Sequence, residues 1–223
     1  MTRPLSLVIG GGAYGAACTR YALGLGHRCV VVDPDPACRA TEIFDTGGVD
    51  AGVKIIAGGI AEALSLILSS HPVRIFPTAP IHVCAALVAE ETGMAAAEIA
   101  PILSRIPPDL IVSSDRGSVT VSYNRDGWCL PSCAAPAICP VTGRRRDVPL
   151  FQVLREALPD AAILESVQCA PGIGALSGPE VLALLEQAAH AEQIVVGTAC
   201  RCHGVVTAMG REKREDQSIL ETV

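Results

Sequence analysis

Several cysteines in the second half of the chain have a spacing that is typical of metal ligands. Cys129, Cys133 and Cys139 form a C-x3-C-x5-C pattern in one segment, and Cys200 and Cys202 open a C-x-C-H pattern in another. Three thiolates from one loop and a fourth from elsewhere commonly hold a [4Fe–4S] cluster. Zinc is the alternative, because four thiolates, or three thiolates and an imidazole, also suit that ion. We therefore expect a Cys-ligated centre, iron–sulfur in preference to zinc; a metal-free loop of reduced thiols or a thiol–disulfide pair fits the same spacing.

Cys200, Cys202 and His203 also fit thiol chemistry. They directly follow an apolar run that predicts a strand, and they lie at the start of Ala199–Met209, which predicts a helix. A thiol at the start of a helix faces the positive end of the helix dipole, which lowers its pKa and makes it more reactive. We expect one of these thiols to act as a ligand or a nucleophile, and His203 as a proton donor, a ligand or a structural cap. Cys169, after another predicted strand, is a further candidate ligand.

Glycine residues near the amino end indicate a nucleotide site. Gly10, Gly12 and Gly15 form a G-x-G-x-x-G pattern directly after a short apolar run and before a helix-forming stretch. In such a turn the first glycine permits the tight bend, the second lets a pyrophosphate approach the backbone, and the third lets the helix pack closely. The N–H groups of the first helical turn, at Ala13 and Tyr14, then face the phosphates. The alternative is a turn whose glycines serve packing alone.

An acidic residue follows the second predicted strand at the position where a ribose is bound. Arg28–Val32 leads directly into Asp33, whose carboxylate would accept hydrogen bonds from ribose hydroxyls and repel a 2′-phosphate. NAD or FAD is therefore favoured over NADP, with S-adenosylmethionine as a minor alternative. Thr78 and His82 follow the predicted strand Val73–Phe76 and are expected at the same edge of the sheet. His82 would line the cleft there, or would be a surface residue at the start of a helix.

Two other segments have a functional and a purely structural interpretation. The glycine-rich loop Ala170–Gly178, with Gly172 and Gly174, would cradle a phosphate or a substrate anion, or would simply make a turn. The basic run Arg144–Arg146 clamps an anionic substrate or a cofactor phosphate, or is a solvated loop.

The spacing of apolar residues predicts the elements that position these side chains. Strand-like and helical stretches alternate, which is typical of a doubly wound parallel sheet with right-handed crossovers. A β-hairpin, from Asp109–Val112 and Ser118–Ser122, and a Pro-, Gly- and Cys-rich loop at 126–147 interrupt this order. The predicted strands are Leu5–Ile9, Arg28–Val32, Val53–Ala57, Val73–Phe76, Ala161–Val167 and Gln193–Gly197. The predicted helices are Ala13–Leu25, Ile60–Ser69, Ile81–Glu91, Ala95–Leu103, Val148–Leu158, Pro179–Ala191 and Ala199–Met209.

Composition limits the class of protein. Half of the 223 residues are apolar and only 3% are aromatic, which suits buried parallel strands filled with Ala, Val, Leu and Ile. The net charge of −6 argues against a nucleic-acid surface. We expect no membrane span and no secretory signal, and hence a cytoplasmic protein whose ten cysteines stay reduced. Cys18, Cys29 and Cys84 lie in apolar stretches and are expected in the core.

The stretch from Pro4 to Asp35 resembles the Rossmann nucleotide-binding superfamily, on its strand, glycine turn, helix, second strand and acidic residue. It is similar to the NAD-binding regulatory domains of Trk-type potassium uptake systems and to the openings of flavin- and NAD-dependent oxidoreductases. The resemblance implies a bound dinucleotide. The transport regulators have no such cysteine set, so the cysteine segments favour an oxidoreductase.

Together these patterns predict an α/β fold, Rossmann-like, with a mostly parallel sheet, helices on both faces, and a β-hairpin and Cys-rich loop as an insertion. We expect a nucleotide-binding lobe at 1–108, a second α/β lobe with the Cys-rich loop at 109–209 and a flexible tail at 210–223; the two lobes could also form one continuous domain. The predicted function is that of a redox protein pairing NAD or FAD with a [4Fe–4S] cluster, or zinc. The alternatives are a non-catalytic NAD- or redox-sensing module and a thiol-based transferase. Expected partners are a small-molecule substrate or a redox partner protein, and a homodimer is left open.

Overall fold

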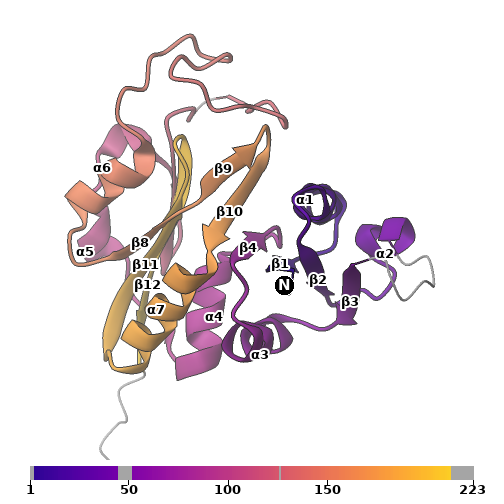
Figure 1. The fold of residues 1–223 in the computed structure, drawn as a ribbon. Helices are drawn as coiled ribbons and strands as arrows, with labels where there is room; N and C mark the ends of the chain where they lie inside the picture. Colours follow the sequence, from indigo (N-terminus) through magenta and orange to yellow (C-terminus); the bar gives the residue numbers. More distant parts are fainter. Residues whose placement is uncertain (1–2, 45–51, 126, 212–223) are drawn as a thin grey trace, which may run out of the picture.

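Two mixed β-sheets with helices packed between and around them form the protein (Figure 1). The computed structural model describes residues 3–44, 52–125 and 127–211. The protein is thus α/β, but the prediction of one mostly parallel sheet is wrong. Within the described residues, no helix combines the length and the apolar character that crossing a membrane requires.

The first sheet has the strand order β3-β2-β1-β4-β10-β9. Its first four strands are parallel, whereas β10 pairs antiparallel with β4 and β9 pairs antiparallel with β10. The second half of the chain therefore completes a sheet that the first half begins. The strands are β1 (Leu5–Ile9), β2 (Arg28–Asp33), β3 (Val53–Ala57), β4 (Arg74–Pro77), β9 (Val167–Ala170) and β10 (Ile173–Ser177).

Helices cover both faces of the first sheet. Successive side chains of a strand point to opposite faces, so a buried strand packs against helices on both sides. Val8 and Phe76 pack in a cluster with α1 (Ala13–Gly24) and α2 (Arg39–Phe44). Leu7, Ile9 and Ile75 pack on the other side in a cluster that includes α3 (Ile60–Ser70). Every residue of β1 is buried, as expected for a central parallel strand.

The second sheet has the strand order β6-β7-β12-β11-β8, and only β11 and β8 are parallel. A short strand, β5 (Ala95–Ala96), pairs with β12. The predicted hairpin is present as β6 and β7. The strands are β6 (Ile111–Ser114), β7 (Ser118–Ser122), β8 (Ala162–Glu165), β11 (Gln193–Ala199) and β12 (His203–Gly210).

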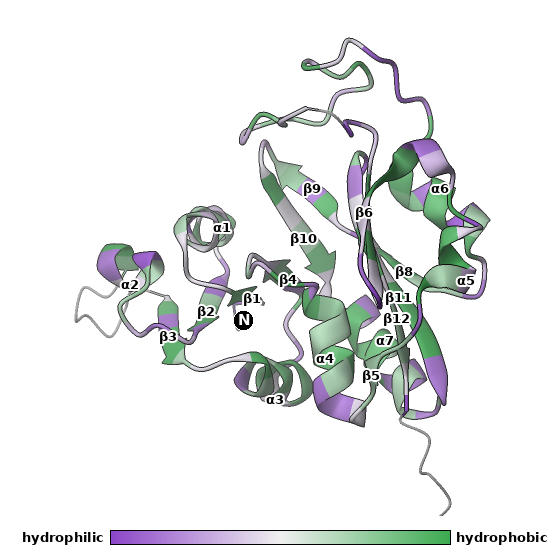
Figure 2. Ribbon diagram, turned by 180° about the vertical axis from the view of Figure 1, so that it is seen from behind, coloured by the Kyte–Doolittle hydropathy of each residue, from purple (hydrophilic) through white to green (hydrophobic). Residues whose placement is uncertain are grey.

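Two helices, α4 (Val83–Thr92) and α7 (Gly178–Ala189), join the two sheets through one hydrophobic core. Another core lies on the far side of the second sheet, under α5 (Ala100–Leu103) and α6 (Leu150–Ala157). A 3-10 helix at Pro108–Leu110 leads into β6. Figure 2 shows α4, which lies in this shared core, mainly in the hydrophobic colours, with hydrophilic residues at its lower end.

Two predicted helices are wrong. Ala199–Met209 is instead the end of β11, a turn and β12, because its Val-Val-Thr run is β-branched and pairs with strands on both sides. Ala95–Leu103 is instead β5 and the short α5, because Pro101 lacks the N–H that a helix starting at Ala95 would need at that position.

Further differences concern the middle of the chain. The predicted strand Ala161–Val167 is divided between β8 and β9, which lie in different sheets. The structure adds α2 and β10, which were not predicted. The predicted tail lies outside the described residues apart from Gly210, which ends β12, and Arg211. Cys18, Cys29 and Cys84 are buried, as predicted.

Candidate functional site

The cysteines of two distant segments share one cavity of about 240 Å³. One segment is the loop between β7 and α6, and the other is the turn that joins β11 to β12. We call this space the cysteine cavity. The predicted ligand and nucleophile residues that line it are Cys129, Cys133, Cys139, Cys200, Cys202 and His203.

The β11–β12 turn holds the thiol of Cys200 at the centre of a set of donors. The N–H of Cys200 donates to the His203 carbonyl over 2.8 Å, which closes the turn. The N–H groups of Cys202 and His203 then both donate to Cys200 Sγ, at 3.3 and 3.4 Å. A hydrogen bond with the Cys202 thiol is the largest cause that holds the pKa of Cys200 well below its ordinary value. Hydrogen bonds with His203 and with these backbone N–H groups lower the pKa further, whereas burial raises it. No helix dipole acts here; a strand turn supplies the N–H groups in its place.

His203 lies between the thiols of the two segments. Its Nε2 is 2.9 Å from Cys129 Sγ, and its Nδ1 is 3.8 Å from Cys200 Sγ. The hydrogen bond with Cys200 is the main cause that raises the pKa of His203 to about 9, against the effect of burial. Asn124 Nδ2 also donates to Cys129 Sγ, over 3.3 Å. The pair of Cys200 and His203 therefore favours a thiolate beside an imidazolium.

Arg146 is a buried cation in the wall of the cysteine cavity. Its guanidinium donates to Cys202 Sγ over 2.5 Å and to the Pro136 carbonyl over 3.0 Å, so it connects the loop to the turn. Arg145, in contrast, pairs with Asp147 at the surface. The basic run was predicted to be either a clamp for anions or a solvated loop. Only Arg146 reaches the cavity, and its contacts there are to a thiol and a carbonyl.

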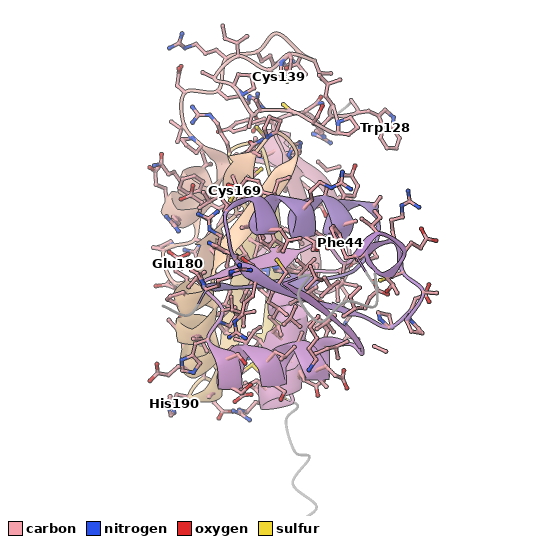
Figure 3. All side chains as sticks on the ribbon, turned by 45° about the vertical axis from the view of Figure 1, so that its right-hand side comes forward. Phe44, Trp128, Cys139, Cys169, Glu180 and His190 are labelled. Carbon is pink, nitrogen blue, oxygen red and sulfur yellow. The ribbon has the colours of Figure 1, made fainter. Side chains whose placement is uncertain are left out.

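Cys139 is the second thiol of the cavity whose pKa is lowered, to about 7. Burial alone would raise the pKa, but hydrogen bonds from Thr142 and the backbone and the charge of Arg146 outweigh burial. Figure 3 shows Cys139 high in the loop and Cys169 lower, near α1. Cys169 is not among the residues that line the cavity; its thiol accepts a hydrogen bond from Arg74 over 3.3 Å.

The second glycine loop supports the cysteine loop. The N–H of Gly172 donates to the Cys133 carbonyl over 3.1 Å, and the Gln168 side chain donates to the same carbonyl. Gly172 has a φ of +75°, and a Cβ at this position would overlap the Pro131 carbonyl. The turn between β9 and β10 thus needs its glycine for a close approach between two backbones.

The thiols share a cavity without forming a finished coordination shell. Across the described residues, no three His, Cys, Asp or Glu side chains lie close enough together to hold a metal ion. A metal would therefore have to draw the loop thiols toward the β11–β12 turn, as metal binding often orders its own site.

The space and the backbone conformation at Gly10, Gly12 and Gly15 agree with the local geometry predicted for each of them. Gly10 has a φ of +104°, and a Cβ there would lie 2.6 Å from Ala79 N. A Cβ at Gly15 would overlap the Gly10 carbonyl, whereas a Cβ at Gly12 would meet nothing within 4 Å. The helix α1 begins at Ala13, and its first turn contains no acidic residue that would compete for an anion. The space beside Gly12, at the start of α1, is therefore open.

Asp33 and Thr78 hold the glycine turn in place. Asp33 accepts hydrogen bonds from Gly11 N, over 2.5 Å, and from Asp35 N, over 2.8 Å. The Thr78 hydroxyl donates to the Gly10 carbonyl over 2.6 Å. Each carboxylate oxygen of Asp33 keeps a lone pair for a ribose hydroxyl, since an ionised carboxylate accepts about four hydrogen bonds.

His82 does not line the cleft. Its Nδ1 is 2.7 Å from the Thr207 hydroxyl, and its buried Nε2 has no hydrogen-bond partner among the described residues. Burial lowers the pKa of His82 to about 4, so the ring is neutral at physiological pH. The side chain was predicted either to line the cleft or to be a surface residue at a helix start; it lies at the start of α4 and contacts β12.

A second cavity, of about 340 Å³, adjoins the cysteine cavity. The two cavities have Ser166, Cys200 and His203 in common. Pro77, at the carboxyl end of β4, also lines the second cavity and directly precedes Thr78. This cavity was not predicted, because its walls come from segments that are far apart in the sequence.

Comparisons with known proteins place the chain among relatives of similar length. Residues 5–83 and 84–212 match two family models, described as the N-terminal and the C-terminal domain of an uncharacterized protein. The two matches meet at the start of α4. A protein of Archaeoglobus fulgidus is 41% identical over 220 residues, which span 93% of this chain and 100% of that relative. No solved structure matches the chain.

Proposed function

The chain belongs to the AF_1314 family, and we propose that it is a redox protein that binds a dinucleotide on its glycine turn and a [4Fe–4S] cluster in its cysteine cavity. The observation that carries the proposal is the convergence of two segments on that cavity, with five thiols and one imidazole in its wall. These five thiols line a cavity, whereas Cys18, Cys29 and Cys84 are buried among apolar side chains of the core.

The electrostatics of the cavity support thiolate ligands. The thiolate is the form that binds metal, and the pKa values of Cys139 and Cys200 are lowered, whereas the hydrogen bond with Cys200 and burial raise the pKa of Cys202. The Arg146 guanidinium would offset part of the negative charge of a thiolate-ligated cluster, which also influences its reduction potential. Zinc is the alternative ion for the same ligands.

The Rossmann-like turn supports the nucleotide, and electron counting favours FAD. Gly12 faces open space, and Asp33 keeps lone pairs beside the turn. A nicotinamide releases a hydride, which carries two electrons, whereas one cluster accepts a single electron. FAD would be held by Gly12 and Asp33 at the glycine turn and would supply one-electron chemistry, which matches the single-electron capacity of a cluster held by the cavity thiols.

A thiol nucleophile is the second candidate function, and the contact between Cys200 and His203 favours it. A thiolate stabilised by an adjacent imidazolium is the common form of an activated cysteine. In this case one thiol would react with a small-molecule electrophile, and the remaining thiols would not be ligands.

Purification without oxygen separates these candidates. We expect visible absorption, with iron and sulfide in the cluster ratio, and loss of both in Cys139→Ser. Cys169→Ser is the matched control, because Cys169 lies outside the cavity, and it should keep the iron. Wild-type protein that is colourless and metal-free overturns the cluster. Zinc without iron would replace it, and rapid alkylation of a single thiol in such metal-free protein would support the nucleophile.

A further inference from the structure

The second cavity lies where one half of a dinucleotide would extend from the glycine turn. We propose that this cavity receives the planar redox ring of the nucleotide, the isoalloxazine of FAD or else a nicotinamide. The ring would then face the cysteine cavity across the shared wall of Ser166, Cys200 and His203. The inference rests on the proposed function and specifies the direction in which the nucleotide extends from the glycine turn.

The strand order defines that direction. In the order β3-β2-β1-β4, the glycine turn follows the central strand β1, and Asp33 ends β2 on one side of it. In parallel sheets ligands bind outside the carboxyl ends of the strands. A nucleotide with its pyrophosphate on the turn and its adenosine ribose at Asp33 must extend its other half over the end of β4. The last residue of β4, Pro77, lines the second cavity.

The hydrogen bonds at the end of β4 join the glycine turn and the cavity into one rigid edge. The Thr78 hydroxyl donates to the Gly10 carbonyl over 2.6 Å, and the N–H of Ala79 donates to the Ile9 carbonyl over 2.8 Å. Thr78 is therefore fixed against the turn, and its neighbour Pro77 is fixed at the cavity wall. A ligand spanning the turn and the cavity would meet preorganised surfaces at both places.

The lining of the second cavity fits a flat, uncharged ring better than a phosphate or a carboxylate. The described residues that line it include no Asp, Glu, Lys or Arg, and its charged groups, the Cys200 thiolate and the His203 imidazolium, are opposite in sign and lie next to each other. Apolar side chains such as Ile81, Val83 and Val205 form most of the wall. The Ser166 and Thr198 hydroxyls and the His203 ring are the polar groups, and they could meet the ring carbonyls or the carboxamide. Such a wall, mainly apolar with a few polar groups, is typical of sites for planar ligands.

Bulky side chains at the cavity wall test the inference without requiring turnover. Ile81→Trp is the first variant, because the wild-type side chain is 53% exposed and enlarging it should not disturb the core. Thr198→Leu is the second, on β11. The matched control is Leu25→Trp, which also replaces an exposed apolar residue (46%) but lines neither cavity. Dissociation constants for FAD, NADH and ADP are measured by calorimetry on nucleotide-free protein.

We expect wild-type protein to bind FAD, or NADH, more tightly than ADP, which lacks the ring. Ile81→Trp and Thr198→Leu should weaken the binding of the ring-bearing nucleotide at least tenfold and change ADP affinity by less than twofold. Whether the affinity for FAD or for NADH falls in these variants identifies which ring the cavity receives. Equal losses for ADP and the dinucleotide, or no loss, would overturn the inference while the glycine-turn site stands. Wild-type protein that binds none of the three would instead refute the nucleotide site of the proposed function.

Discussion

Replacing Gly12 by alanine separates a nucleotide-binding role of the glycine turn from a packing role. A Cβ at Gly12 would meet nothing within 4 Å, and the residue has a φ of −65°, which alanine adopts readily. Alanine is a poorer residue than glycine at the start of a helix, but it also reduces the entropy of the unfolded chain. The free energy of unfolding should therefore change by less than about 1 kcal/mol.

Nucleotide affinity should respond much more strongly to the same methyl group. The open space at Gly12 is where a pyrophosphate would approach the backbone, and a Cβ would keep it away from the first N–H groups of α1. We expect the dissociation constant for FAD or NADH to rise at least tenfold, which corresponds to about 1.4 kcal/mol. Calorimetric titration measures the affinity, and urea unfolding measures the stability of the same preparation.

Two other glycines provide the comparison. Gly24 lies at the end of α1, where an added methyl group would meet nothing within 4 Å, so Gly24→Ala should raise stability by about 0.5–1 kcal/mol and leave affinity unchanged. A Cβ at Gly15 would overlap the Gly10 carbonyl, so Gly15→Ala should lose roughly 2–3 kcal/mol of stability. Wild-type affinity in Gly12→Ala would refute the assignment of this turn to a nucleotide.

The buried and the exposed arginine of the basic run should contribute differently to stability. Arg146→Met removes the hydrogen bonds to Cys202 and Pro136 and should lower the free energy of unfolding in urea by about 3 kcal/mol. Arg145→Met, at the surface, should lower it by less than about 0.5 kcal/mol. For metal-free protein, the raised pKa of His203 predicts a stabilising contribution that is complete below its ordinary value of 6.5 and is lost as the pH rises through about 9. Urea unfolding at pH 6, 8 and 10 should therefore show the advantage of wild type over His203→Gln shrinking at high pH, and parallel curves would contradict this. Gly172→Ala should speed proteolysis of the cysteine loop more than Gly143→Ala does. Both residues have a positive φ, but a Cβ at Gly172 would overlap a loop carbonyl, whereas a Cβ at Gly143, with a φ of +67°, would meet nothing within 4 Å. Equal rates of proteolysis in the two variants would assign the whole effect to backbone strain.

The local patterns of the chain predicted its first half well. The strands β1 to β4 and the helices α1, α3 and α4 follow from apolar spacing, and the three glycines of the turn have the space and conformation that their positions predicted. The same approach failed at Ala199–Met209, where helical spacing and β-branched residues conflict, and only pairing with β7 and β11 resolves the conflict. It also did not show that β9 and β10, from the second half of the chain, complete the first sheet.

The sequence by itself determined which residues could do chemistry: a glycine turn with an acid after the next strand, and thiols at the spacing of ligands. Each of these signals lies within a few residues of chain, where backbone geometry and residue type decide the outcome. Only the tertiary structure decided that the two cysteine segments meet, that Arg146 is buried against Cys202 while Arg145 is not, and that a second cavity connects the cysteines to the end of β4. Those outcomes depend on strand pairing and on the removal of water by residues far away in the sequence, so no local pattern contains them.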